Sequence, residues 1–445
     1  MNTTKLYQID VYTKEWDAKV TSVEQKDSGI FVTLDQTAFF PEGGGQSCDL
    51  GLIDAFSVID VQEQKQADGT TVIHTIAAAS GDDLPVPGQQ VHCQLNWEHR
   101  FDNMQRHCGE HILSGIFYRL YGGVNRGFHM GHDCMTIDIS LEEMPEITEL
   151  TWEMAQQAER EANQVIWSDA PVTVLRFDTR GEAEKMPLRK ALAFDEDISI
   201  VSVGSIENAA DCVACCGTHP SSAGQVGLIK LFKIEKYKGM FRVYFEAGQR
   251  ALQDYEEKHN ILTALAARYS SSIEEFPDKL CVQEEKLSAV KNELFHLKRA
   301  LIEIECERLD ARIAAKAARP DCGQTADSPD SPLIIYELQH FAMDDVFQMA
   351  KHYLNDQKGK KKNSGQQKTD AVRSTGGNLL LLYSVPDTSC VLVSDGSIPC
   401  GSLVKEYASF YQGKGGGSNT SARAMFDSRE NAMLFADLLS KHLRG

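Results

Sequence analysis

Several features are scarce in this sequence, and each scarcity excludes a class of protein. No uninterrupted apolar run approaches the roughly 18 residues that a membrane-spanning helix needs. The first residues, MNTTKLYQIDVYTKEW, show no basic segment followed by an apolar one, so we expect no secretory signal. The 12 cysteines are too widely spread in 445 residues for a disulfide scaffold, which is small and cysteine-dense. Together these absences predict a cytosolic protein with reduced thiols.

Basic residues are also in deficit. Lysine and arginine number 45 against 64 aspartate and glutamate residues, which leaves a formal net charge of −19. Because contacts to nucleic-acid phosphates need lysine and arginine, a polyanionic partner would require basic residues that are concentrated locally. The sequence offers three such groups: Lys230, Lys233, Lys236, Lys238 and Arg242; Arg180, Lys185, Arg189 and Lys190; and the lysines of 358–362. Each is as compatible with an ordinary solvated surface as with a binding face.

The length and the residue pattern predict a multidomain α+β protein. At roughly 150 residues per domain, the chain is expected to have about three domains. Residues 1–95 contain short β-branched runs separated by turns, and we expect an N-terminal β-barrel domain there. Residues 96–248 combine helical periodicity, as in Asn103–Leu120 and Leu150–Ile166, with strand-like runs and no regular β-α-β alternation. This segment is predicted to be an α+β core.

Residues 249–318 are charged and helical in pattern. Their apolar residues follow the 3-4-3-4-3 spacing of a coiled-coil seam, at Leu287, Val290, Leu294, Leu297, Leu301 and Ile304. Ser270–Ser272 and Pro277 interrupt the helical pattern before this seam. An antiparallel helical hairpin within the chain and a dimeric coiled coil are therefore both open.

The last part of the chain follows a linker over Arg319–Pro332 that is rich in proline, serine and aspartate. Residues 333–445 contain strand-like and helical runs, which predict a compact α/β domain. A glycine-rich loop with Gly415, Gly416 and Gly417 lies near its end. We expect a short helix over Ser421–Asp427 after this loop.

Two short motifs predict a metal site. His107 and His111 are four residues apart, so on a helix their imidazoles lie on one face, one turn apart, as zinc binding requires. Cys215 and His219 repeat this spacing later in the chain, and the four side chains form a His₃Cys set of the kind that zinc prefers. Glu110, between the two histidines, is expected to be a solvated helix residue.

Spacing alone leaves the cysteine ligand open. Cys212 and Cys215 form a C-x2-C pair, so a Cys₂His₂ site is an alternative, and Cys216 could take the place of Cys215 if the loop turned differently. A reduced cysteine cluster without metal is a third reading. Four protein ligands would fill a tetrahedral site and indicate a structural or positioning ion, whereas direct catalysis by zinc needs an open position.

These motifs resemble those of a known family. Leu34–Gln46, with the sequence LDQTAFFPEGGGQ, resembles the glycine-rich motif of the alanyl-tRNA synthetase editing region, and the two metal motifs resemble its zinc motifs in the same order. Glu246–Ala251 resembles the segment after the editing core, and residues 333–445 resemble the DHH-associated domain of these synthetases. Because an activation domain would have no room before Tyr7, the chain is similar to the stand-alone AlaX editing proteins in their long form.

The resemblance implies an activity and a set of site residues. The activity is an aminoacyl-tRNA deacylase that acts in trans on alanine tRNA mischarged with serine or glycine. The implied site consists of Zn²⁺ ligands at His107, His111, Cys215 and His219, catalytic candidates at Thr37 and Gln46, and substrate-binding candidates at Gly43, Gly44, Gly45, Lys230, Lys233, Gly415, Gly416 and Gly417. Cys216 stands where the family usually has glycine. We also expect a homodimer, with tRNA as partner and no nucleotide cofactor.

Two other functions fit the same motifs. Threonyl-tRNA synthetase editing domains share the zinc motifs, so another mischarged tRNA could be the substrate, although the glycine-rich motif and the C-terminal domain favour alanine. A non-catalytic tRNA-binding protein with structural zinc is the alternative from a different class. A phosphodiesterase is excluded, because the chain has no Asp-His-His run.

Overall fold

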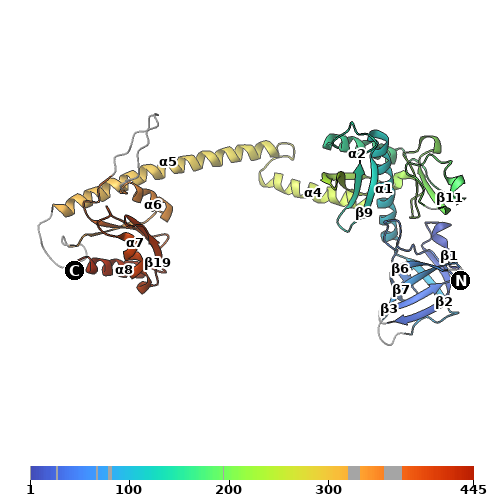
Figure 1. The fold of residues 1–445 in the computed structure, drawn as a ribbon, viewed down its shortest axis with the longest axis horizontal. Coiled ribbons are helices and arrows are strands. Elements are labelled where there is room, and N and C mark those ends of the chain that lie inside the picture. Colours follow the sequence, from blue (N-terminus) through green and yellow to red (C-terminus); the bar gives the residue numbers. More distant parts are fainter. Residues whose placement is uncertain are drawn as a thin grey trace. The chain divides into compact units, whose positions relative to one another are not determined.

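The computed structural model describes residues 2–26, 29–66, 69–78, 83–193, 195–318, 331–354 and 373–444. As predicted, the fold is α+β and multidomain, with two compact units, Met1–Ser270 and Ser271–Gly445 (Figure 1). The predicted linker over Arg319–Pro332 lies almost entirely outside the described residues, and the lysines of 358–362 lie outside them entirely. Within the described ranges, no helix combines the length and apolarity that crossing a membrane requires.

The N-terminal part of the first unit is a closed barrel whose strands pair in the order β2-β3-β7-β6-β5-β8 (Figure 1). Alternate residues of its strands point inward, where Val32, Val61 and Val72 belong to one apolar core. The strands are β2 (Glu15–Lys26), β3 (Gly29–Leu34), β5 (Gly51–Ile53), β6 (Phe56–Gln66), β7 (Gly69–Ala77) and β8 (Gln90–Leu95). Outside the barrel, β1 (Thr4–Lys5) and the short helix η1 (Leu6–Gln8) precede it, and β1 pairs in parallel with β4 (Gln36–Thr37), which leads into the glycine loop.

Helix α1 (Trp97–Tyr121) follows the barrel and runs through the interior of the unit. It begins where the side chain of Asn96 accepts a hydrogen bond from the backbone N–H of His99, and it ends at Gly122, which has the left-handed backbone conformation of a helix C-terminus. A Cβ on Gly115 would overlap the carbonyl oxygen of Ala210, so glycine lets the helix lie directly against its neighbour. Because α1 is covered so closely, its polar residues are buried together with its apolar ones.

Two antiparallel sheets complete the first unit. Their strand orders are β14-β15-β10-β9 and β11-β12-β13. The elements are β9 (Val124–Met130), β10 (Met135–Ser140), α2 (Trp152–Trp167), β11 (Val172–Thr179), α3 (Arg180–Ala183), β12 (Glu196–Val203), η2 (Ile206–Asn208), β13 (Asp211–Ala214), η3 (Ala223–Val226), β14 (Ile229–Tyr237), β15 (Met240–Ala247) and α4 (Gly248–Arg268). The helices predicted over Asn103–Leu120 and Leu150–Ile166 are confirmed as α1 and α2.

The second unit is a five-stranded sheet with helices on both faces. Its strand order is β16-β17-β18-β20-β19. Its elements are α5 (Phe276–Ala317), β16 (Leu333–Leu338), α6 (Met343–Lys351), β17 (Leu379–Ser384), β18 (Ser389–Val393), α7 (Cys400–Tyr407), η4 (Ala408–Tyr411), β19 (Lys414–Gly417), β20 (Ser421–Met425) and α8 (Arg429–His442). Leu380 and Leu382 share a core with α5 and α6, whereas Leu379 and Leu381 share one with α7 and α8. The alternation along β17 therefore builds two cores, one on each face.

Helix α5 uses only its C-terminal part to pack against this sheet. Ile302, Cys306, Leu309 and Ile313 are buried there. The six residues of the predicted seam are all exposed, from Leu301 at 42% to Leu297 at 61%. The helical character of 249–318 is confirmed by α4 and α5, while the hairpin and the coiled coil stay predictions.

The helix expected over Ser421–Asp427 was a wrong prediction. Ser421–Met425 is strand β20, in which Ala422 and Ala424 are buried and the residues between them are more exposed. This is the period-two alternation of a strand. Gly415, Gly416 and Gly417 lie in the edge strand β19, where a Cβ on Gly415 or Gly417 would overlap the backbone of β20. These glycines therefore allow close strand pairing rather than forming an open loop.

Candidate metal centre

The structure brings the four predicted metal ligands together. His107 and His111 project from successive turns of α1, and Cys215 and His219 come from the segment that follows β13. One ligand atom from each residue lies within 4.8 Å of the others. The three histidines are buried and Cys215 is nearly so. The two motifs thus form one cluster, although His107 and Cys215 are 108 residues apart in the sequence.

Two of the distances in this cluster fit a tetrahedral zinc site. The Sγ atom of Cys215 lies 3.4 Å from Nε2 of His107 and 3.4 Å from Nε2 of His219. With a Zn–S distance of about 2.3 Å and a Zn–N distance of about 2.0 Å, tetrahedral ligands are separated by about 3.5 Å. The observed separations therefore suit sulfur and nitrogen atoms that share one ion.

Two of the imidazoles are oriented by acceptors behind them. Nδ1 of His107 lies 2.9 Å from Oε1 of Gln46, and Nδ1 of His111 lies 2.9 Å from Oδ2 of Asp211. Because both partners are oxygen acceptors, Nδ1 carries the proton in each ring and Nε2 keeps its lone pair for the cluster. Carboxylate and amide partners of this kind typically fix metal-binding histidines. Nδ1 of His219 is buried with no hydrogen-bond partner in the described residues.

The charges in the cluster favour the ligand form of Cys215. Burial opposes ionisation of this thiol, but the three surrounding imidazoles outweigh it and hold the pKa of Cys215 well below its usual value. Burial, aided by the neighbouring imidazoles, lowers the pKa of His219 to about 4, against the opposing effect of the Cys215 thiolate. A thiolate and neutral imidazoles are the forms that bind a metal ion. His219 and Cys215 are therefore close to the forms that bind a cation. His111, by contrast, must release a proton, because the effect of burial on its pKa is outweighed by Cys215 and Asp211, which raise it well above the usual value.

The alternative cysteine ligands lie elsewhere. Asp211 and Cys212 are adjacent on β13, so their side chains point to opposite faces of the strand. Asp211 faces His111, whereas Cys212 packs in an apolar cluster with Ile198 and Ile200. Cys216 is exposed. The geometry therefore favours Cys215 over both neighbours.

Two predictions about charged residues near the cluster were wrong. Glu110 is buried, and its Oε1 accepts hydrogen bonds from Ser114 Oγ and Asn125 Nδ2 instead of facing solvent. Arg189, which the sequence grouped with basic surface residues, donates to Asp211 over 2.6 Å with its side chain buried. Although burial opposes it, the Arg189 charge contributes most to holding the pKa of Asp211 below its usual value. Their partners lie far away in the sequence, so local patterns could not identify these interactions.

Gln46 and Thr37, the two catalytic candidates, occupy different surroundings. Gln46 is buried beside the cluster, where its Oε1 accepts from His107 and from the N–H of Thr218, and its Nε2 donates to Thr218 Oγ1. Thr37 is buried against the barrel, and its hydroxyl lies 2.9 Å from Nε2 of His74. Nδ1 of His74 must donate to the carbonyl of Val32, so Thr37 donates to Nε2.

The glycine loop lies against the second metal motif. Gly43 and Gln46 exchange backbone hydrogen bonds of 3.1 and 3.0 Å, which close a tight turn with positive φ at Gly44 and Gly45. A Cβ on Gly44 would lie 3.1 Å from Sγ of Cys216, and one on Gly45 would lie 2.8 Å from Cδ1 of Phe128. The loop thus reaches the metal cluster through Gln46, and its backbone packs against Cys216 and Phe128 beside the cluster.

The predicted basic groups are largely paired with acidic residues. Lys230 forms an ion pair with Glu159 over 2.7 Å, and Lys233 with Glu235 over 2.9 Å. The same is true of Lys236 with Glu149, of Arg242 with Asp138, and of Arg180 with Glu184 and Asp195. This pairing reduces the positive potential that the sequence pattern suggested.

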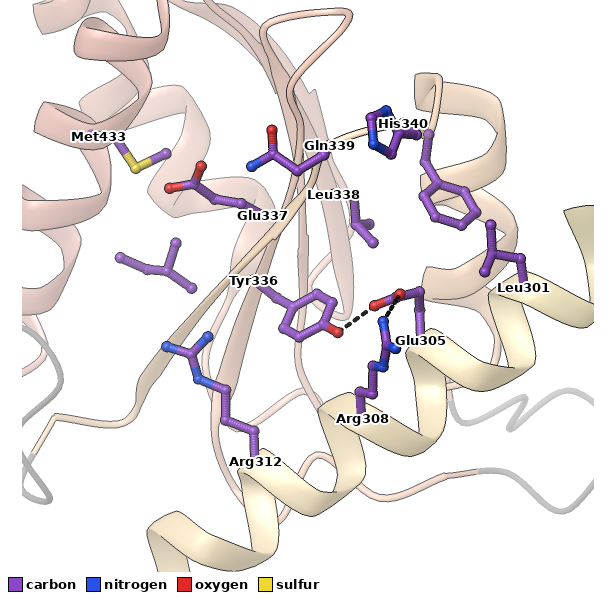
Figure 2. A pocket seen from close by; sticks show the side chains of 12 residues that line it. Leu301, Glu305, Arg308, Arg312, Tyr336, Glu337, Leu338, Gln339, His340 and Met433 are labelled. Carbon is purple, nitrogen blue, oxygen red and sulfur yellow. Dashed lines mark hydrogen bonds and ion pairs between the residues drawn. The ribbon is translucent and has the colours of Figure 1, made fainter.

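The second unit contains a separate pocket of about 820 Å³ beside the edge strand β16. Figure 2 shows Tyr336 and Arg308 converging on Glu305, and Arg312 on the same helix. Its apolar lining includes Leu301, Leu338 and Met433. Gly415, Gly416 and Gly417 are not among the lining residues, so the pocket and the second glycine motif are distinct features.

Comparison with known proteins supports the resemblance to the editing region of alanyl-tRNA synthetases. Residues 3–99 match the class II (A) tRNA synthetase family, and residues 198–244 match the threonyl and alanyl tRNA synthetase second additional domain. The alanyl-tRNA editing protein AlaX-L of Pyrococcus horikoshii is 28% identical, over 99% of both chains. The alanyl-tRNA editing protein Aarsd1 of Danio rerio is 30% identical, over 61% of this chain and 65% of its own.

Full synthetases match over a smaller share of their length. The alanine–tRNA ligase of Pyrobaculum aerophilum is 32% identical over 57% of this chain, which corresponds to 28% of the ligase. The similarity to AlaX-L, by contrast, extends from one end of the chain to the other. With the two domain matches and the gathered His₃Cys cluster, the chain is similar along its whole length to the long form of the AlaX editing proteins.

Proposed function

We propose that this protein is a trans-editing hydrolase that removes serine, or also glycine, from mischarged alanine tRNA. The observation that carries the proposal is the hydrogen bond between Gln46 of the glycine loop and the metal-ligand candidate His107. It joins the two motifs that the editing proteins share into one site. The names of the relatives AlaX-L and Aarsd1, both alanyl-tRNA editing proteins, support the same substrate class.

An editing reaction is needed because alanine and serine differ by one hydroxyl group. A pocket for alanine cannot strongly reject an analogue that merely adds a hydroxyl, so a second site that hydrolyses the wrong ester is the expected remedy. In this proposal Thr37 contacts the serine hydroxyl. Thr37 donates its proton to His74 and accepts a hydrogen bond from the N–H of Phe39, so its hydroxyl has one lone pair left and the serine hydroxyl would be the donor.

We propose that His107, His111, Cys215 and His219 hold Zn²⁺. When bound, zinc can polarise a carbonyl or lower the pKa of a water molecule, provided that a coordination position is open. Gln46 and Asp211 keep Nε2 of His107 and of His111 directed at the cluster. In this proposal the backbone of Gly43, Gly44 and Gly45 faces the substrate. Gln46 acts as a positioning residue, because it holds His107, more than as a proton donor.

The remaining parts of the chain have proposed roles in binding tRNA. We assign the editing region to 1–95 and 96–248, a helical connection to 249–318, and an accessory tRNA-binding domain to 333–445. Lys230, Lys233, Gly415, Gly416 and Gly417 are the proposed contacts outside the reaction site. A homodimer and a cytosolic location are part of the same proposal.

The test is deacylation of seryl- and alanyl-esters of alanine tRNA by the full chain, before and after zinc chelation. We expect rapid release of serine, sparing of alanine and loss of activity on chelation. Salt-sensitive tRNA binding without any deacylation would make the protein a binding protein with structural zinc. If the protein deacylates esters of threonine tRNA faster than the seryl-ester of alanine tRNA, its substrate would be another mischarged tRNA.

A further inference from the structure

The hairpin formed by β9 and β10 contains an irregularity next to the metal cluster. Gly127 pairs with Asp138, but Asn125 pairs with Ile139, so Arg126 is an extra residue in β9. Such a β-bulge changes the direction of the side chains that follow it. In a regular strand, residues three apart, such as Asn125 and Phe128, would point to opposite faces. The bulge places both on the side of α1.

Asn125 fastens the bulge to α1. Its Nδ2 donates to Oε1 of Glu110 over 2.8 Å and to Oγ of Ser114 over 3.0 Å, and Ser114 donates to the same Glu110 oxygen over 2.6 Å. All three side chains are buried. Removing one of these three side chains would leave buried polar groups without partners, which destabilises the fold. The hydrogen bonds therefore fix the position of β9 along α1.

Phe128 occupies the next position on the same side. Its ring stacks on the imidazole of His107 with a centroid distance of 5.8 Å and an interplanar angle of 24°. His107 and Glu110 are three residues apart on α1 and therefore share a face of the helix. The edge of the Phe128 ring fills the place where a Cβ of Gly45 would be. One ring thus touches both a metal-ligand candidate and the glycine loop.

We propose that Phe128 is a positioning residue of the editing reaction, which rests on the function proposed above. Its rigid ring packs against both Gly45 and His107 and so supports the position of the loop backbone relative to the metal ligands. The β-bulge at Arg126 and the hydrogen bond between Glu110 and Asn125 hold the ring in this position. Phe128 is only partly buried, unlike the fully buried Phe117 and Phe245 of the same core, which is consistent with a role at the site boundary.

The first test removes the ring and keeps an apolar side chain. Phe128→Leu is compared with the control variant Phe56→Leu. Phe56 is a partly buried phenylalanine of the barrel, so the control substitution removes the same atoms in a different apolar core. Because a displacement of about 1 Å can cost about 100-fold in rate, we expect Phe128→Leu to lower kcat/KM for seryl-alanine tRNA about 10-fold or more, with zinc content unchanged. Phe128→Tyr, which keeps the ring, should stay within about 3-fold of the unaltered protein.

The second test measures the coupling between the loop and the ring. Gly45→Ala introduces a Cβ that meets the ring at a positive φ and should reduce kcat/KM about 100-fold. Adding Phe128→Leu makes space, so the double variant should be about 5-fold more active than Gly45→Ala alone, although the backbone strain persists. Strictly additive losses would overturn the inference, and so would a Phe128→Leu protein as active as Phe56→Leu.

A measurement that needs no activity separates this inference from the proposed function. Amide hydrogen exchange of the segment 41–47, followed by mass spectrometry, should accelerate about 5-fold in Phe128→Leu and stay unchanged in Phe56→Leu. Unchanged exchange in Phe128→Leu would refute the positioning role. If the unaltered protein deacylates no tRNA ester, the proposed function fails, and the exchange result still decides whether Phe128 holds the glycine loop.

Discussion

Helices α1 and α5 reverse the usual relation between polarity and burial. Helix α1 buries Arg100, Arg106, Glu110 and two histidines. The N-terminal part of α5 exposes leucines, with Leu294 at 51% and Leu297 at 61%. A buried charge is costly unless it is paired, and an exposed apolar stripe indicates a surface whose partner lies outside the unit. Hydropathy by itself would have predicted that α1 is exposed and that the N-terminal part of α5 is buried.

The buried polar groups of α1 are tolerable because each has a specific partner. Arg100 binds Asp49, Arg106 binds Glu246, and His111 binds Asp211. Each pair joins the helix to a different segment: the loop before β5, the end of β15 and the start of β13. The same contacts that compensate the charges thereby arrange the metal cluster. The seam of α5 has no comparable set of contacts within its own unit among the described residues.

The largest expected effect concerns the metal cluster on α1. Cys215→Ala should lose zinc, from about one ion per chain to none, and lose deacylation with it, because the thiolate is the ligand that carries negative charge. Cys212→Ala, in the apolar cluster beside it, should keep its zinc. The check is metal analysis of both variants together with the rate on seryl-alanine tRNA. Equal zinc loss in the two variants would contradict the ligand assignment.

The next effect is on the stability of the first unit. Arg100→Ala leaves Asp49 buried without its partner, so we expect a loss of about 3–5 kcal/mol in the free energy of unfolding. Arg180→Ala removes two exposed ion pairs in the same unit and should cost far less, because solvent screens exposed charges. Urea unfolding of both variants gives the comparison. Similar losses would mean that burial does not distinguish the two pairs.

His74 supplies a pH-dependent version of the same comparison. Burial lowers its pKa from 6.5 to about 4, while its hydrogen bond to Val32 acts in the opposite direction. Below pH 6.5 the unfolded chain takes up a proton at His74 that the folded barrel does not. The contribution of His74 to the free energy of unfolding is therefore fully present above this pH and falls by about 3 kcal/mol towards pH 4. Urea midpoints should show this decline in the unaltered chain and a weaker one in His74→Gln. Identical pH profiles would rule out a buried neutral His74.

The smallest expected effect on stability is in the seam of α5. Leu294→Glu combined with Leu297→Glu changes exposed positions, so the free energy of unfolding of a single chain should change by less than about 0.5 kcal/mol. If the proposed homodimer forms through the seam, the same variant should halve the molar mass measured by light scattering. A loss of several kcal/mol without a change of mass would place the seam against another part of its own chain.

The sequence was most informative where a site depends on local geometry. His107 and His111, and then Cys215 and His219, could be identified because a helical turn and a short loop bring residues four apart together. The strand β20 was missed because its small residues, Ala422 and Ala424, also suit a helix, and pairing with the glycines of β19 decided between the two. Glu110 was misassigned because its partner Asn125 meets it only through the β-bulge.

The amino-acid pattern by itself determined the α+β class, the helices α1, α2, α4 and α5, and the four metal-ligand candidates, because these follow from periodicity and from the chemistry of single side chains. Only the tertiary structure decided that Gln46 orients His107, that Asp211 and Arg189 support His111, and that Phe128 packs against both Gly45 and His107. These contacts join segments that are distant in the chain. Their formation depends on how whole elements pack, which no local spacing encodes.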